Sequence, residues 1–201
     1  HVYTVDEHTI QAIGLLAKIE RGECKTEHPV ASEVIHKISS RRALYMSVLF
    51  QDIAKGRGGD QSVLGARVAK RVCSRLGLDA EESESVEWLV AEHLLMSDVA
   101  QKRDLNDPKT IRDFVETVQS PERLRLLLCL TVVDMRATGP NVWNNWKAQL
   151  LRELYHGAGD VMSGGQLTDA RADRVASAKA KLEEALADWS ADDIATHMDR
   201  G

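Results

Sequence analysis

Residues 48–62 read VLFQDIAKGRGGDQS: the end of an apolar helix, a glycine-rich basic loop and the start of another helix. Asp60 or Ser62 is placed to cap that second helix. On the first helix, one face carries at helical spacing Leu44, Val48, Gln51, Asp52 and Lys55. An amide, a carboxylate and an ammonium therefore continue an apolar stripe inward. Because buried polar groups are costly unless something pairs with them, this face predicts a ligand or metal site.

The composition favours an all-α fold. Hydrophobic residues make up 43% of the 201 residues, aromatic residues make up only 4%, and there are 4 prolines. Such a chain is long enough to bury a core of Leu, Ala and Val between helices, whereas a β-sandwich is richer in aromatic and β-branched residues.

The charge and the cysteines argue against several classes of function. A net charge of −5 disfavours DNA or RNA binding, although Lys55 and Arg57 form a local basic spot. No apolar run approaches the roughly 20 residues of a membrane helix, and no signal peptide is apparent, so we expect no membrane association. The cysteines are odd in number and widely spaced, and they read as reduced thiols of a cytoplasmic protein: Cys24, Cys73 and Cys129.

Apolar periodicity and capping residues predict the helices. Thr4 and Glu7 have the spacing of a capping box, Pro108 suits a first helical position, and Gly77 suits a C-cap. The helices expected up to residue 155 are Thr4 to about Glu20, a short one from about Pro29, Arg41–Lys55, Ser62–Leu76, Glu81 to about Met96, Pro108–Val118, Pro121–Thr138 and Trp143–Tyr155. After these we expect a loop at Gly157–Gly165, a long helix at Gln166–Trp189 and a short helix to about Asp199.

Three further polar residues lie on apolar stripes of predicted helices: His8, His93 and Asp134. A lone histidine on such a face is more often a core residue with satisfied hydrogen bonds than a ligand. An unpaired buried carboxylate would be neutralised or expelled, so a cation is the simpler account of Asp134. By contrast, His28 and His36 in the polar connection are expected to be solvated.

Four phrases of the chain resemble a known family. They are HVYTVDEHT (residues 1–9), DIAKGRGGD (52–60), WLVAEHLLMS (88–97) and DMRATGP (134–140). They are similar to the HD phosphohydrolase domain of the bifunctional uridylyltransferase/uridylyl-removing enzymes of bacterial nitrogen signalling. The resemblance is dense to residue 155 and thin afterwards. It implies an HD-domain helical bundle at residues 1–155 and, at 156–201, a helical extension that packs on this domain or leads out of it.

The same resemblance implies further domains in a longer parent protein. The chain begins at His1 and not at Met, so we expect it to be one domain of that parent. A nucleotidyltransferase domain would precede it and regulatory domains would follow. The Gly-Ser and paired-Asp signature of a nucleotidyltransferase is missing here, so this chain alone should not transfer UMP.

Carried over residue by residue, the resemblance implies a site. Its metal ligands would be His8, Gln51, Asp52, Gln61, His93 and Asp134. Asp52, Lys55 and His93 would be catalytic, and Lys55, Arg57 and Arg136 would bind phosphate; Arg136 could equally be a structural partner of a carboxylate. Mg²⁺ or Mn²⁺ is expected as the cofactor, with Fe²⁺ or Co²⁺ as alternatives. The substrate would be the PII signal protein carrying UMP on a tyrosine, and the reaction hydrolysis of that phosphodiester.

Two glutamines depart from the family pattern, because Gln51 and Gln61 stand where the family has histidines. A neutral amide is a poorer ligand than imidazole for the softer metals, so we expect reduced metal occupancy and weakened or abolished hydrolysis. The same change at both positions suggests deliberate substitution, and natural loss of activity is the other explanation. A non-catalytic binding module for a nucleotidylated protein or a nucleotide is the alternative function.

Overall fold

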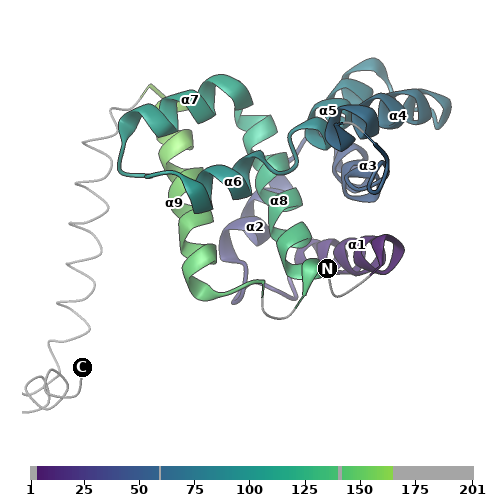
Figure 1. Cartoon of the computed structure of the whole chain (residues 1–201). Coiled ribbons are helices and arrows are strands. Elements are labelled where there is room, and N and C mark those ends of the chain that lie inside the picture. Colours follow the sequence, from purple (N-terminus) through teal and green to yellow (C-terminus); the bar gives the residue numbers. More distant parts are fainter. Residues whose placement is uncertain (1–3, 59, 140–141, 165–201) are drawn as a thin grey trace, which may run out of the picture.

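A computed structural model describes residues 4–58, 60–139 and 142–164 of the chain. These residues form helices without any strand, as the composition predicts (Figure 1). The helices are α1 (Val5–Glu20), α2 (Pro29–Val34), the 3-10 helix η1 (Ile35–Lys37), α3 (Arg41–Phe50), α4 (Gln61–Arg75), α5 (Ala80–Ala91), α6 (Leu95–Lys102), α7 (Pro108–Val118), α8 (Pro121–Thr138) and α9 (Asn145–Met162).

The helix termini follow local signals in the sequence. The backbone N–H of Thr4 donates to the Glu7 carboxylate at 3.3 Å, which is the reciprocal bond of the predicted capping box. Asp60 is the N-cap of α4 and accepts from the N–H groups of Ser62 and Val63. Gly77 follows the end of α4 with φ +79°, a left-handed conformation that glycine adopts without strain.

Buried apolar side chains form two clusters. The larger one surrounds α8, which is buried along most of its length, and it draws on α1, α2, α6, α7 and α9. The smaller one lies among α3, α4 and α5, which stand together at one side of the molecule in Figure 1. Helix α3 joins the two, because Leu44 and Val48 belong to the larger cluster whereas Ala43 and Phe50 belong to the smaller one.

The helix predicted to reach Lys55 ends at Phe50. After it the backbone N–H groups of Ile53, Lys55 and Arg57 each donate to the carbonyl three residues earlier, at 2.9–3.1 Å. Such bonds give tighter turns than an α-helix. The sequence pattern placed Asp52 and Lys55 on a regular helix, and the structure instead places them on these turns.

Two other predicted boundaries are also wrong. The helix expected to run to about Met96 stops at Ala91, and the separate helix α6 begins at Leu95. The loop predicted at residues 157–165 is helical to Met162, and the small residue Gly157 is buried where α9 packs against Ile111 of α7. The helices predicted at 166–189 and up to 199 lie outside the described residues.

Exposure differs from expectation at one histidine. His36 is exposed as predicted, but His28 is buried, with its ring edge-to-face against Trp143 at 5.0 Å between centroids. None of the helices in the described residues is both long enough and apolar enough to cross a membrane.

Candidate metal centre

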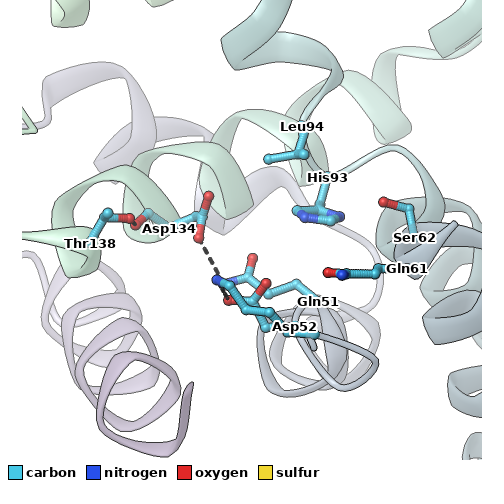
Figure 2. Close-up of a pocket in the computed structure, with 9 residues that line it drawn as sticks. Gln51, Asp52, Gln61, Ser62, His93, Leu94, Asp134 and Thr138 are labelled. Carbon is cyan, nitrogen blue, oxygen red and sulfur yellow. Dashed lines mark hydrogen bonds and ion pairs between the residues drawn. The ribbon is translucent and has the colours of Figure 1, made fainter. Parts of the chain in front are cut away.

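The structure contains a cavity of about 290 Å³ that is lined by residues from four parts of the chain (Figure 2). Its walls come from the turns after α3, the start of α4, the break before α6 and the C-terminal half of α8. The residues that line it are Gln51, Asp52, Lys55, Gln61, Ser62, His93, Leu94, Asp134 and Thr138.

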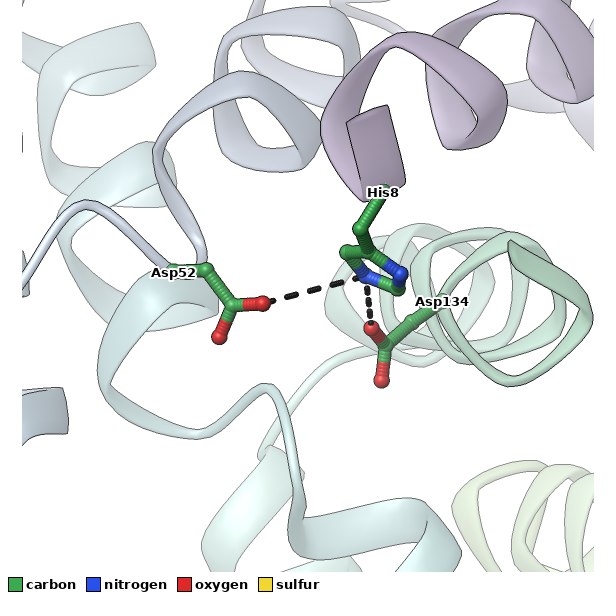
Figure 3. A group of neighbouring side chains, drawn as sticks. All are labelled: His8, Asp52 and Asp134. Atoms are coloured by element: carbon green, nitrogen blue, oxygen red, sulfur yellow. Dashed lines mark hydrogen bonds and ion pairs between the residues drawn. The ribbon is translucent and has the colours of Figure 1, made fainter. Parts of the chain in front are cut away.

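A histidine and two carboxylates meet at one side of this cavity. The ligand atoms of His8, Asp52 and Asp134 all lie within 4.8 Å of one another, and we name these residues the His8 cluster (Figure 3). His8 Nε2 lies 2.9 Å from Asp134 Oδ1 and 3.8 Å from Asp52 Oδ2. His8 is only 3% exposed, so a buried imidazole faces two partly buried carboxylates.

The packing of α1 on α8 brings His8 to Asp134, although 126 positions separate them in the sequence. The hydrogen bond from His8 to Asp134 raises the pKa of His8 above its usual value, and burial opposes this effect. The imidazole and the carboxylate thus stabilise each other as a hydrogen-bonded pair.

Gln51 lies against the His8 cluster. It is 3% exposed, and its side-chain Nε2 donates a hydrogen bond to Asp134 Oδ1 at 3.1 Å. The same Nε2 lies 3.3 Å from His8 Nε2. The amide oxygen Oε1 is buried and has no hydrogen-bond partner among the described residues. Burial of a polar atom without a partner costs free energy.

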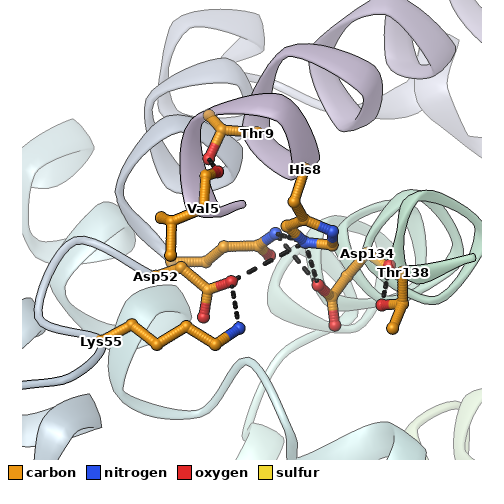
Figure 4. Close-up of polar contacts among 8 residues, drawn as sticks. Val5, His8, Thr9, Asp52, Lys55, Asp134 and Thr138 are labelled. Carbon is orange, nitrogen blue, oxygen red and sulfur yellow. Dashed lines mark hydrogen bonds and ion pairs between the residues drawn. The ribbon is translucent and has the colours of Figure 1, made fainter. Parts of the chain in front are cut away.

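Lys55 is paired within the site. Its ammonium Nζ donates to Asp52 Oδ2 at 2.8 Å, so the carboxylate lies between the lysine and His8 (Figure 4). Thr138, one turn beyond Asp134 on α8, donates its hydroxyl to the Asp134 carbonyl at 2.8 Å. Lys55 is partly exposed, which leaves its ammonium accessible from the cavity.

His93 and Gln61 lie across the cavity from Asp134 in Figure 2. The Nδ1–H of His93 donates to the carbonyl of Val90 at 2.8 Å, which in a continuous helix would bond the N–H of Leu94. This bond helps to explain the break after α5, and it leaves Nε2 as the nitrogen that can accept a proton or bind a metal. Gln61 is exposed, and its amide donates to the Arg57 carbonyl at 3.4 Å.

The structure thus brings the six residues of the predicted ligand set to one cavity or its edge, together with Lys55. The two arginines are not among the residues that line it. Arg57 is exposed, and Arg136 pairs with Glu27 at 3.0 Å, which is the structural role left open from the sequence. Ser62, Leu94 and Thr138 also line the cavity but were not predicted as site residues. Their only signal is position, since each lies beside a predicted site residue or one helical turn from it.

The donor set of the His8 cluster fits a divalent cation. One imidazole and two carboxylates are ligands that Mn²⁺, Fe²⁺ and Mg²⁺ accept in proteins. The partnerless Gln51 oxygen is a fourth possible donor at the same place. The described residues therefore contain a candidate metal centre that opens into a cavity.

Comparison with known proteins gives one consistent result. No protein-family profile matches the chain. A bifunctional uridylyltransferase/uridylyl-removing enzyme of Azospirillum brasilense is 62% identical over 201 residues, which is 100% of this chain and 22% of that protein. Proteins of the same description from Novosphingobium aromaticivorans and Rhodospirillum rubrum are 63% identical over 179 residues and 59% identical over 189 residues. These cover 89% and 94% of this chain and 20% of each relative. The chain is therefore related along its whole length to a segment of the bifunctional uridylyltransferase/uridylyl-removing enzymes, and it spans about one fifth of their length.

Proposed function

We propose that this chain is the uridylyl-removing part of such an enzyme: an HD-type, metal-dependent phosphodiesterase that hydrolyses the UMP–tyrosine bond on the PII signal protein. The observation that carries the proposal is the convergence of His8, Asp52 and Asp134 beside a cavity that also holds a lysine. The name of the relatives supports the uridylyl-removing activity. We also propose that residues 1–155 form the catalytic domain and that 156–201 extend it.

The residues of the chain have distinct tasks in this reaction. His8, Asp52 and Asp134, with His93 on the far wall, would hold the cation. A bound divalent cation would supply Lewis-acid activation of a water and neutralise charge on the phosphodiester. Lys55 would bind a phosphoryl oxygen, since its ammonium reaches the cavity next to Asp52. The cavity wall formed by Leu94 and Thr138 would limit the access of other water to the reacting diester.

We propose that Gln51 and Gln61 weaken this activity. The Gln51 amide points its N–H at Asp134, and an N–H group repels a cation. Gln61 presents an amide where the family has imidazole. The expected metal is Mg²⁺ or Mn²⁺, because two of the remaining ligands, Asp52 and Asp134, are carboxylates.

Restoring both imidazoles tests the proposal. The double variant Gln51→His/Gln61→His should bind Mn²⁺ more tightly than the native chain and release UMP from uridylylated PII. Each single variant should recover less than the double, because ligands that share a metal act as a unit. In the double variant, Lys55→Ala should lower the rate about 100-fold while Mn²⁺ stays bound.

The matched control is Lys102→Ala, which removes an ion pair of the same length to Asp98 on the exposed face of α6. It should leave UMP release unchanged. A double variant that binds Mn²⁺, measured by calorimetry, yet releases no UMP from uridylylated PII would refute the phosphodiesterase assignment.

The second candidate is a non-catalytic module that binds a nucleotidylated protein. The hydrogen bond from Gln51 to Asp134 favours it, since this bond satisfies a ligand carboxylate from within the chain. Binding of uridylylated PII by the native chain in EDTA, with unmodified PII as the comparison, would support this candidate. No difference between the two forms of PII would argue against it.

A further inference from the structure

The contacts of Gln51 assign this residue a role beyond weakening the proposed activity. We propose that the Gln51 amide donates its hydrogen bond to Asp134 at the place where a cation would otherwise contact this carboxylate, so that the His8 cluster is stable without metal. A cation can then bind only after the amide turns. This inference rests on the proposed metal site for its second half only.

The amide N–H donates to Asp134, the carboxylate of the cluster that lies nearer to His8. Asp134 Oδ1 accepts a hydrogen bond from Gln51 Nε2 at 3.1 Å and another from His8 Nε2 at 2.9 Å. In the other carboxylate, Asp52 Oδ2 accepts a hydrogen bond from the Lys55 ammonium at 2.8 Å. Each carboxylate of the cluster is thus already bonded to a donor from the chain, and two buried or partly buried anions can remain close together.

The orientation of the amide follows from these partners. If its oxygen and nitrogen were exchanged, Oε1 would face the Asp134 carboxylate, and two acceptors would repel each other. The observed orientation therefore suits a site without metal. In this orientation Oε1 is buried without a hydrogen-bond partner in the part of the chain that the structure describes. The hydrogen bond of Nε2 must offset the free-energy cost of burying that oxygen.

A bound cation would favour the opposite orientation of the Gln51 amide. It repels the amide N–H and attracts the amide oxygen, so metal binding requires the Gln51 side chain to turn and to lose its bond to Asp134. The environment that would accommodate the turned amide is the same buried space, because Gln51 is 3% exposed. Gln51 is therefore a two-position side chain whose position depends on the metal.

Thermal unfolding of the full chain in EDTA tests the first half. Gln51→Leu removes the amide and keeps a branched apolar side chain that is one bond shorter, and it should lower the unfolding midpoint by about 2–4 °C, as expected for one net hydrogen bond in a chain of this size. The matched control Gln61→Leu, at an exposed site with one weak contact, should change it by less than about 1 °C. Equal midpoints for the two variants would overturn the proposal.

A second measurement applies even if Gln51→Leu fails to fold. In the native chain labelled with ¹⁵N, the Gln51 side-chain amide protons should exchange with solvent more slowly than those of Gln61. Equally fast exchange at both side chains would also overturn the proposal.

Addition of Mn²⁺ tests the second half. Gln51→Glu adds a third carboxylate beside Asp134, so it should unfold earlier than the native chain in EDTA and gain stability in Mn²⁺. The native chain should gain much less at the same Mn²⁺ concentration. An equal gain in both would contradict the turning amide. If neither Gln51→Glu nor Gln51→His responds to Mn²⁺, the proposed metal site fails, while the EDTA measurements still decide whether the amide stabilises the site.

Discussion

The pKa of a buried histidine in this protein depends on the groups that it contacts. Two histidines of the chain are both buried, yet their environments act in opposite directions. The hydrogen bond to Asp134 raises the pKa of His8, whereas burial, assisted by the charge of Arg136, lowers the pKa of His28 to about 4. The folded chain therefore favours the protonated form of His8 and the neutral form of His28.

His28 should make the fold sensitive to acid. Its pKa is about 6.5 when unfolded and about 4 when folded, so the unfolded state binds the proton more readily. The contribution of His28 is complete above pH 6.5 and falls as the pH drops toward 4. The loss between pH 7.5 and pH 5 should be about 2 kcal/mol of unfolding free energy. Urea unfolding at both pH values measures this loss.

Two variants isolate the effect from the other titrating groups. His28→Leu should unfold with a smaller dependence on pH than the native chain, because the buried imidazole at position 28 is removed. His36→Leu changes an exposed histidine and should keep the native dependence. Identical pH dependence in all three chains would show that burial of His28 does not control acid stability.

At the scale of helices, the contact between α4 and α5 positions one wall of the cavity. Gly65 of α4 is the point of close approach, because a Cβ atom added there would lie 3.3 Å from Val90 Cγ1 on α5. Helix α4 carries Gln61 at its start, and α5 leads into the break that holds His93. A small residue at position 65 therefore brings these two parts of the site together.

Substitution of two helical glycines by alanine, one at a time, should show how much helix propensity and how much packing contribute to the unfolding free energy. Gly14→Ala on α1 meets no atom within 4 Å and should stabilise the chain by about 0.5–1 kcal/mol through helix propensity alone. Gly65→Ala has the same propensity gain, but the tight contact with Val90 should remove it or reverse its sign. Chemical denaturation of both variants gives the comparison. An equal gain at both positions would mean that α4 and α5 are not closely packed at Gly65.

At the scale of the whole molecule, the buried thiols belong to two apolar clusters. The larger cluster includes Cys24 and Cys129, and the smaller one includes Cys73. All three thiols are buried and unpaired, in agreement with the reduced cysteines expected from the sequence. Because the smaller cluster has fewer buried apolar side chains, its helices should open more readily than the core around α8.

The reaction rates of the cysteines can show whether the smaller cluster opens more readily than the core around α8. Cys73 and Cys129 are both fully buried, but Cys73 lies in the smaller cluster, and burial raises the pKa of Cys129 to about 12. In the native chain, Cys73 should therefore react with a thiol reagent faster than Cys129. Mass spectrometry of labelled peptides at successive times measures both rates, and reaction in denaturant provides the intrinsic rates as a control. Equal native rates, after this correction, would show that the two clusters open as one unit.

Local sequence determined the class of fold and most helix ends. Apolar spacing and low aromatic content indicated helices, and the capping residues Thr4, Asp60 and Gly77 act on atoms within a few positions of themselves. The polar residues on apolar stripes could also be identified, since helical spacing alone turns His8 and Asp134 toward the core. Resemblance to a family, and not spacing, suggested that they act together.

Tertiary structure decided what those residues contact. The end of α3 at Phe50, the break at His93, the burial of His28 and the pairing of Arg136 with Glu27 depend on groups that the sequence pattern does not bring together. The bond from Gln51 to Asp134 spans 83 positions, and it decides which way the amide points. Helical periodicity specifies a face, because it is set by bonds within one turn. The partner on that face is specified only when distant helices pack and exclude water between them.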